Sequence, residues 1–187
     1  MRKIALTTAL LTVALAGVAQ ADGGSSTTAG TTAEKLCRAE RGTTTATRAA
    51  FAEKYGTNKN KKNAFGKCVS KQTAAQVKED TAAEANASKD CRAEQGTTAE
   101  TQAAFDAKYG TNKNKKNAFG KCVSQKRGEA VTADDAAEVS AAKACSTERG
   151  TTTEAQAAFA QKYGTNANKK NAFGKCVSQK ASAESHS

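Results

Sequence analysis

The sequence predicts an all-α protein made of three tandem 54-residue helical repeats, each stapled by one disulfide. Two cysteines recur at this period, and they stand 31 positions apart inside every repeat. The segment KYGTNKNKKNAFGKCVS recurs with them, and its third copy differs only in Ala167. The chain is rich in alanine and contains no proline, which favours helices. A period of this length indicates copies of one supersecondary unit.

Residues 1–21 have the three parts of a signal peptide. Arg2 and Lys3 are followed by an uncharged apolar run that ends at Val18, and the small-x-small sequence AQA stands at 19–21. The alternative is a membrane anchor, but the run has about 15 residues where about 20 are needed to span a bilayer. We therefore expect cleavage after Ala21, a secreted protein with possible retention at the cell wall, and no integral membrane segment in the mature chain.

The rest of the chain divides by composition and by the repeat. A Gly-, Ser- and Thr-rich stretch at the start has almost nothing to bury and is typical of a flexible linker, and the chain ends in a polar tail. The expected boundaries are 22–32 for the linker, 33–71 for repeat unit 1, 72–126 for unit 2 with its leading helix, 127–180 for unit 3 with its leading helix, and 181–187 for the tail.

The first helix of each unit is expected to lead into the first cysteine and to end at a glycine, Gly42 in unit 1. Capping boxes predict where it begins. Because neither proline nor glycine stands between Cys68 and Gln95, units 1 and 2 are expected to share a nearly continuous helix, whereas Gly128 predicts a break before unit 3. The boxes are Thr31-x-x-Glu34, Thr81-x-x-Glu84 and Asp135-x-x-Glu138.

The second and third helices of each unit are expected to supply the core. In unit 1 the second helix carries Phe51 and Tyr55 on one face and ends at Gly56. Capping boxes starting at Thr97 and Thr151 predict its beginning in units 2 and 3. The third helix is expected to start near Lys61, and it has one apolar stripe that consists of Ala64, Phe65, Cys68 and Val69.

The six cysteines are expected to form one disulfide inside each unit. Six cysteines allow 15 pairings, and the simplest arrangement treats every unit alike. Each bridge closes a loop of about 32 residues and contributes roughly 3.5 kcal/mol. The alternative of metal-binding or catalytic thiols lacks C-x-x-C pairs, and the single histidine is His186 in the tail, so we expect no metal and no cofactor. The predicted pairs are Cys37–Cys68, Cys91–Cys122 and Cys145–Cys176.

Positive charge is concentrated in the three repeated segments. The stretches Lys54–Lys71, Lys108–Lys126 and Lys162–Lys180, here called the basic segments, contain six, six and five lysines and no acidic residue. The remainder of the chain after Ala21 has 10 basic and 18 acidic residues. Each unit is therefore expected to present a basic hairpin on an acidic helix.

This charge pattern favours a non-enzymatic role in binding an anionic extracellular polymer, such as wall polymer, polysaccharide or nucleic acid. In the alternative, the lysines attract acidic helices of the same protein, and the chain is purely structural. A secreted hydrolase whose acids are brought together by the fold is a third interpretation; no catalytic residue is assigned. The recurring Glu40, Glu94 and Glu148 are expected to form salt bridges. The candidate polymer-binding residues are Lys59, Lys61, Lys62, Lys67, Lys113, Lys115, Lys116, Lys121, Lys169, Lys170 and Lys175.

The segment KYGTNKNKKNAFGKCVS, with the preceding cysteine and AAF, resembles a motif in small, often alanine-rich repeat proteins that bacteria secrete and that are uncharacterised. The resemblance covers the three units. It implies an exported bacterial protein, and it assigns neither an activity nor any functional residue.

Overall fold

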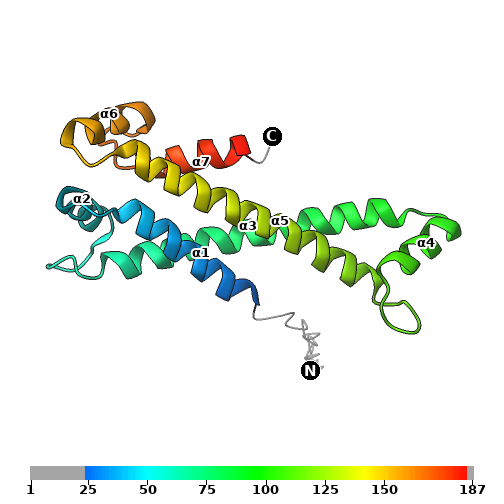
Figure 1. Ribbon diagram of the computed structural model, residues 1–187. Coiled ribbons are helices and arrows are strands. Elements are labelled where there is room, and N and C mark those ends of the chain that lie inside the picture. Colours follow the sequence, from blue (N-terminus) through cyan, green and yellow to red (C-terminus); the bar gives the residue numbers. More distant parts are fainter. Residues whose placement is uncertain (1–23, 185–187) are drawn as a thin grey trace, which may run out of the picture.

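The computed structural model describes residues 24–184, which fold into seven α-helices with no β-strand in this range (Figure 1). The predicted all-α class with three repeats is confirmed. The predicted signal peptide lies outside the described residues. The helices are α1 (Gly24–Arg41), α2 (Thr45–Tyr55), α3 (Ala64–Gln95), α4 (Ala99–Tyr109), α5 (Ala118–Arg149), α6 (Thr153–Tyr163) and α7 (Ala172–Glu184).

Two long helices, α3 and α5, are each shared by neighbouring units. Both are 32 residues long, or about 48 Å at 1.5 Å per residue. The helix α3 closes unit 1 against α1 and then opens unit 2 against α5, and α5 continues into unit 3 against α7. The break predicted at Gly128 is therefore wrong. A glycine inside a helix costs only about 1 kcal/mol, and packing of α5 on both neighbours offsets that cost.

Units 1 and 3 lie together at one end of the molecule, and unit 2 lies at the other end (Figure 1). The helices α2 and α6 mark the shared end, and α4 marks the end that unit 2 occupies alone. The contact between units 1 and 3 is made by α1 and α5. The Thr32 hydroxyl on α1 donates a hydrogen bond to Asp135 on α5 at 2.9 Å. The chain therefore folds back so that its first and last repeats meet.

Several predicted helix starts are wrong. The expected flexible linker is helical from Gly24, because Ala29 and Thr32 are buried against the rest of the fold. The capping boxes expected for the first helices lie inside α1, α3 and α5, since tertiary packing extends these helices past the boxes. The third helix of unit 1 begins at Ala64 and not near Lys61, whose φ of 54° is left-handed. At the other end, α7 takes in the first residues of the predicted polar tail, up to Glu184.

The short second helices begin at a threonine cap. The Thr44 hydroxyl oxygen accepts the backbone N–H of Thr47 at 3.1 Å, and Thr98 and Thr152 do the same in units 2 and 3. The starts predicted in units 2 and 3 are therefore one residue early. Before each cap stands a glycine with φ between 64° and 66°. This left-handed conformation confirms the predicted ends of the first helices at these glycines.

The three predicted disulfides form, and each joins the first and third helices of its unit with the two Cα atoms 6.0 Å apart. All six cysteines are fully buried. In unit 1 the rings of Phe51 and Tyr55 pack beside the bridge with centroids 4.9 Å apart. Disulfides are typical of proteins in oxidising, extracellular compartments. Within residues 24–184, every helix is either too short or too polar to cross a bilayer.

Candidate anion-binding surface

A tight turn between the second and third helices carries most of the candidate lysines of each unit. In unit 1 the Asn63 side chain organises this turn. Its Oδ1 accepts the backbone N–H of Thr57 at 3.1 Å, and its Nδ2 donates to the Thr57 hydroxyl at 2.7 Å. Asn117 and Asn171 repeat both bonds in units 2 and 3. These side-chain amides are therefore engaged in the turn itself.

Three of the eleven candidate lysines brace this turn. The Lys61 ammonium donates to the carbonyl oxygen of Gly56 at 3.1 Å. Lys115 and Lys169 make the equivalent bond at 2.7 and 2.9 Å, and all three have a φ between 54° and 57°. An ammonium has three donors. These lysines therefore hold the backbone. Lys61 also pairs with Glu53 at 3.9 Å, whereas none of the described carboxylates pairs with Lys115 or Lys169.

The other eight candidate lysines lie in the turn or at the start of the helix that follows it, and are here called the turn lysines. All are exposed. Within residues 24–184, no carboxylate oxygen lies within 4.0 Å of their ammonium groups. The acids of the described fold therefore leave this charge uncompensated. The turn lysines are Lys59, Lys62, Lys67, Lys113, Lys116, Lys121, Lys170 and Lys175.

The recurring glutamates bind lysines at the base of the basic segments. The Glu94 carboxylate forms ion pairs with Lys108 at 2.5 Å and Lys126 at 3.0 Å, and it accepts a hydrogen bond from the Tyr109 hydroxyl at 3.0 Å. Hydrogen bonds from Lys108 and Lys126 lower the pKa of Glu94 to about 2. Glu148 has the equivalent partners in unit 3, and its pKa is also lowered to about 2, chiefly by the bond from its first lysine. The predicted salt bridges of these glutamates are confirmed.

Glu40, the equivalent residue in unit 1, is more deeply placed, with 6% of its surface exposed. It binds the Lys54 ammonium and accepts the Tyr55 hydroxyl at 2.7 Å. Burial, and then the charge of Glu40, raises the pKa of Tyr55 far above its usual range. The negative charge of Glu40 is thus already matched inside the protein.

Unit 1 differs from the others in the lysine at the end of its basic segment. Units 2 and 3 end in Gln-Lys, and Lys126 and Lys180 bind the recurring glutamate. Unit 1 has the reverse order, Lys71 and then Gln72. Lys71 is exposed, and none of the carboxylates of residues 24–184 pairs with it. Unit 1 therefore has an additional cation free to meet a ligand.

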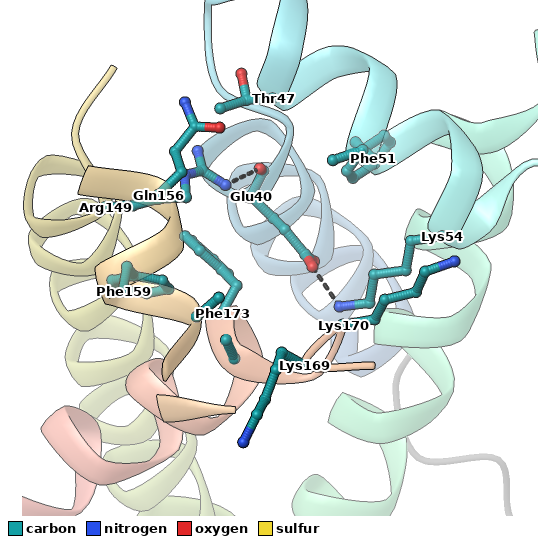
Figure 2. A pocket seen from close by; sticks show the side chains of 13 residues that line it. Glu40, Thr47, Phe51, Lys54, Arg149, Gln156, Phe159, Lys169, Lys170 and Phe173 are labelled. Atoms are coloured by element: carbon teal, nitrogen blue, oxygen red, sulfur yellow. Dashed lines mark hydrogen bonds and ion pairs between the residues drawn. The ribbon is translucent and has the colours of Figure 1, made fainter. Parts of the chain in front are cut away.

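Two of the cavities between units 1 and 3 share Glu40, Lys54 and Lys170 in their walls. Figure 2 looks into the smaller one, of about 170 Å³, where Glu40 lies between Arg149 and Lys54. The Arg149 guanidinium donates to the backbone oxygens of Ala39 and Glu40, at 3.2 and 2.5 Å. The larger cavity, of about 430 Å³, is lined by lysines from both units.

A second cluster, of acids, lies where α3 and α5 meet near the middle of the molecule. The Gln76 amide donates to Glu138 at 2.6 Å and to Glu79 at 3.0 Å. Burial, and then the charge of Glu79, raises the pKa of Glu138 to about 7. The pKa of Glu79 is raised too, by burial and then by Asp134. In the described part of the chain, no group of three His, Cys, Asp or Glu side chains has the geometry of a metal site.

The sequence predicted the lysines, but not the pairing of units 1 and 3 that gathers some of them around a cavity. One signal was available: aligning the three units reveals the reversed Lys71-Gln72 order. The cavity itself depends on contacts between α1 and α5, which no local pattern encodes.

Comparison of the chain with protein-family models, with curated proteins and with solved structures finds no match.

Proposed function

We propose that this protein is a secreted, non-enzymatic binding protein that holds an anionic extracellular polymer through the turn lysines of its three units. The observation that carries the proposal is the contrast between two sets of lysines. Those at the base of the basic segments, such as Lys108, are paired with glutamates, whereas the turn lysines have no carboxylate partner among residues 24–184. Uncompensated charge of one sign concentrates ligands of the opposite sign.

Secretion is supported by the signal-peptide features of residues 1–21 and by the three disulfides. Outside a cell the available polyanions include wall polymers, acidic polysaccharides and nucleic acid. A protein that binds a wall polymer would be retained at the cell surface. Three basic turns on one scaffold also favour a long ligand, because linked contacts raise the effective concentration of the next one.

The purely structural interpretation draws support from the base lysines, which do neutralise the glutamates of their own units. It leaves the turn lysines without a role. The hydrolase interpretation draws support from Glu79 and Glu138, two carboxyl groups that share the Gln76 amide. If that pair were catalytic, Glu138→Gln would abolish hydrolysis and leave polymer retention intact.

The test is retention of the mature protein on anionic matrices across a salt series. Lys62→Gln, Lys116→Gln and Lys170→Gln remove one turn lysine from each unit. The matched control, Lys78→Gln with Lys89→Gln and Lys143→Gln, removes the same charge from exposed positions on the long helices. We expect retention to fall steeply with salt and the turn variant to be lost at lower salt than the control, with the same melting temperature. Equal retention of the two variants would contradict the proposal.

A further inference from the structure

We infer that the larger of the two cavities that share Glu40, Lys54 and Lys170 is the site that binds the polymer most tightly, and that it takes an anionic saccharide segment. This rests on the proposed function and adds to it a place and a ligand class. The cavity, here called the inter-unit groove, measures about 430 Å³ and is lined by Lys71 and Gln72 of unit 1 and by Asn166, Lys170, Lys175 and Ser178 of unit 3.

The charge of the inter-unit groove is positive. Lys71, Lys170 and Lys175 are exposed, and within residues 24–184 no carboxylate pairs with any of them. The acid that lines the groove is Glu40, and Lys54 and the Tyr55 hydroxyl already bind it. Three uncompensated cations from two units therefore face one space. A ligand that enters it must bring negative charge.

The other groups in the groove suit hydroxyl-rich ligands. The side chains of Gln72, Asn166 and Ser178 make no hydrogen bond to another described residue, so their amide and hydroxyl groups remain available. Amides and hydroxyls both donate and accept, as sugar hydroxyl groups require. The volume of the groove lies in the range of about 300–1,000 Å³ that is usual for small-ligand sites. Cations beside such groups fit a sugar chain that carries carboxylate or phosphate.

The inter-unit groove offers little exposed aromatic surface on which the bases of a single-stranded nucleic acid could stack. Bases bind by stacking on exposed aromatic rings. The aromatic residue that lines the groove is Tyr55, which is 8% exposed and donates its hydroxyl to Glu40. A saccharide is therefore favoured over a nucleic acid as the ligand.

Unit 2 supplies a natural control for this inference. Lys116 and Lys121 stand at the positions of Lys170 and Lys175, in an almost identical turn. The turn after α4 and the start of α5, which carry them, lie at the opposite end of the molecule from α2 and α6 (Figure 1). Where unit 1 has Lys71, unit 2 has glutamine. Equivalent lysines are thus present once in the inter-unit groove and once at the end of the molecule that unit 2 occupies alone.

The experiment measures binding of short ligands to the full mature protein by calorimetry at low salt. The probes are an oligogalacturonate, a phosphorylated oligosaccharide and a single-stranded DNA of equal net charge. The groove variant carries Lys71→Gln and Lys170→Gln, and the control variant carries Lys116→Gln and Lys121→Gln. We expect one tight saccharide site per chain. The groove variant should weaken it about tenfold or more, because it loses two charge-assisted contacts, and the control less than twofold.

Each outcome separates the inference from the proposed function. Equal weakening by both variants, with retention of the parent protein on anionic matrices intact, would overturn the groove and leave polymer binding standing. Tighter binding of the DNA than of either saccharide would overturn the ligand class. A parent protein that no anionic matrix retains at low salt would overturn the proposed function itself. Melting curves of both variants should match the parent, because all four lysines are exposed.

Discussion

Units 2 and 3 have nearly the same sequence from their second helix to their second cysteine, yet their cores differ. In unit 3, Phe173 and Val177 are 7% and 9% exposed and belong to one cluster with Leu36 of α1. Their equivalents in unit 2, Phe119 and Val123, are only partly buried. The difference teaches that α1 of unit 1 completes the core of unit 3, whereas Phe65 and Val69 of unit 1 stay partly buried, as their equivalents in unit 2 do.

Two substitutions between the units account for this difference. Leu36 of unit 1, which packs on unit 3, stands where unit 2 has Asp90. Arg149, which donates to the last carbonyls of α1, stands where unit 2 has Gln95. An aspartate and a glutamine cannot make these contacts. Unit 2 lies at the opposite end because the long helices α3 and α5 lead the chain there and back, and its own residues at these two positions would not reproduce the contacts of the paired end.

Removing a disulfide gives the largest expected effect and tests whether the paired end is more stable. Cys91→Ser with Cys122→Ser and Cys145→Ser with Cys176→Ser open loops with the same separation of 31. Each double variant should lose roughly 3.5 kcal/mol of its free energy of unfolding. We expect hydrogen exchange to show α4 unfolded in the first variant and α6 still protected in the second, because unit 3 remains packed on α1. Equal loss of protection in α4 and α6 would break the comparison.

The substitution Arg149→Gln gives unit 3 the glutamine that unit 2 has at the equivalent position, Gln95. The change leaves the Ala39 and Glu40 carbonyls without their charged donor, which costs about 1–3 kcal/mol. We expect the melting temperature to fall by several degrees, and Arg48→Gln, at an exposed position of α2, to leave it unchanged. A melting temperature equal to the parent's would mean that the bridge does not hold the two units together.

Tyrosine-to-phenylalanine variants compare the tyrosine–glutamate hydrogen bond at the paired end with the equivalent bond in unit 2. Tyr55 donates to the buried Glu40, whereas Tyr109 donates to Glu94, whose side chain is 29% exposed. We expect Tyr55→Phe to cost about 1–2 kcal/mol and Tyr109→Phe less than about 0.5 kcal/mol, since water can replace the second hydroxyl. Urea unfolding measures both changes, and equal costs would show that burial of Glu40 adds nothing.

The smallest expected effect is a pH dependence at the central acids. Glu138 faces Gln76 and Glu79 of α3, with Asp134 and Asp135 on its own helix and serines 178 and 182 of α7 across a cavity. Its pKa is raised from 4.5 to about 7, so the stability from its protonation is complete below 4.5 and is lost as pH rises through 7.

We therefore expect the melting temperature to be about 1–3 °C higher at pH near 5.5 than at pH near 8, and Glu138→Gln to remove most of this slope. A smaller part remains with Glu79 and Asp135, because burial raises their pKa values as well. The pKa values of Glu94 and Glu148 are lowered to about 2. Their contribution to the stability of the fold is therefore lost only as pH falls below 4.5, outside the range of this measurement. A slope of unchanged size in Glu138→Gln would assign the pH dependence to another group.

Features that depend on local interactions could be predicted from the sequence, whereas features that depend on packing between helices could not. The glycine helix ends at Gly42, Gly96 and Gly150 were predictable, because a left-handed residue is a local requirement. The starts of the long helices were not predictable. Capping boxes signal a local preference, and packing along α3 and α5 overrode it.

The sequence by itself determined the repeat, the helical class and the pairing of cysteines within units, because period and symmetry leave one simple arrangement. It also determined where the lysines gather along the chain. Only the tertiary structure decided that units 1 and 3 meet, that Arg149 caps α1, and that Lys71 and Lys170 face one groove. The physical reason is that these features depend on contacts between helices far apart in sequence, such as that of Leu36 with α5, which no local sequence pattern specifies.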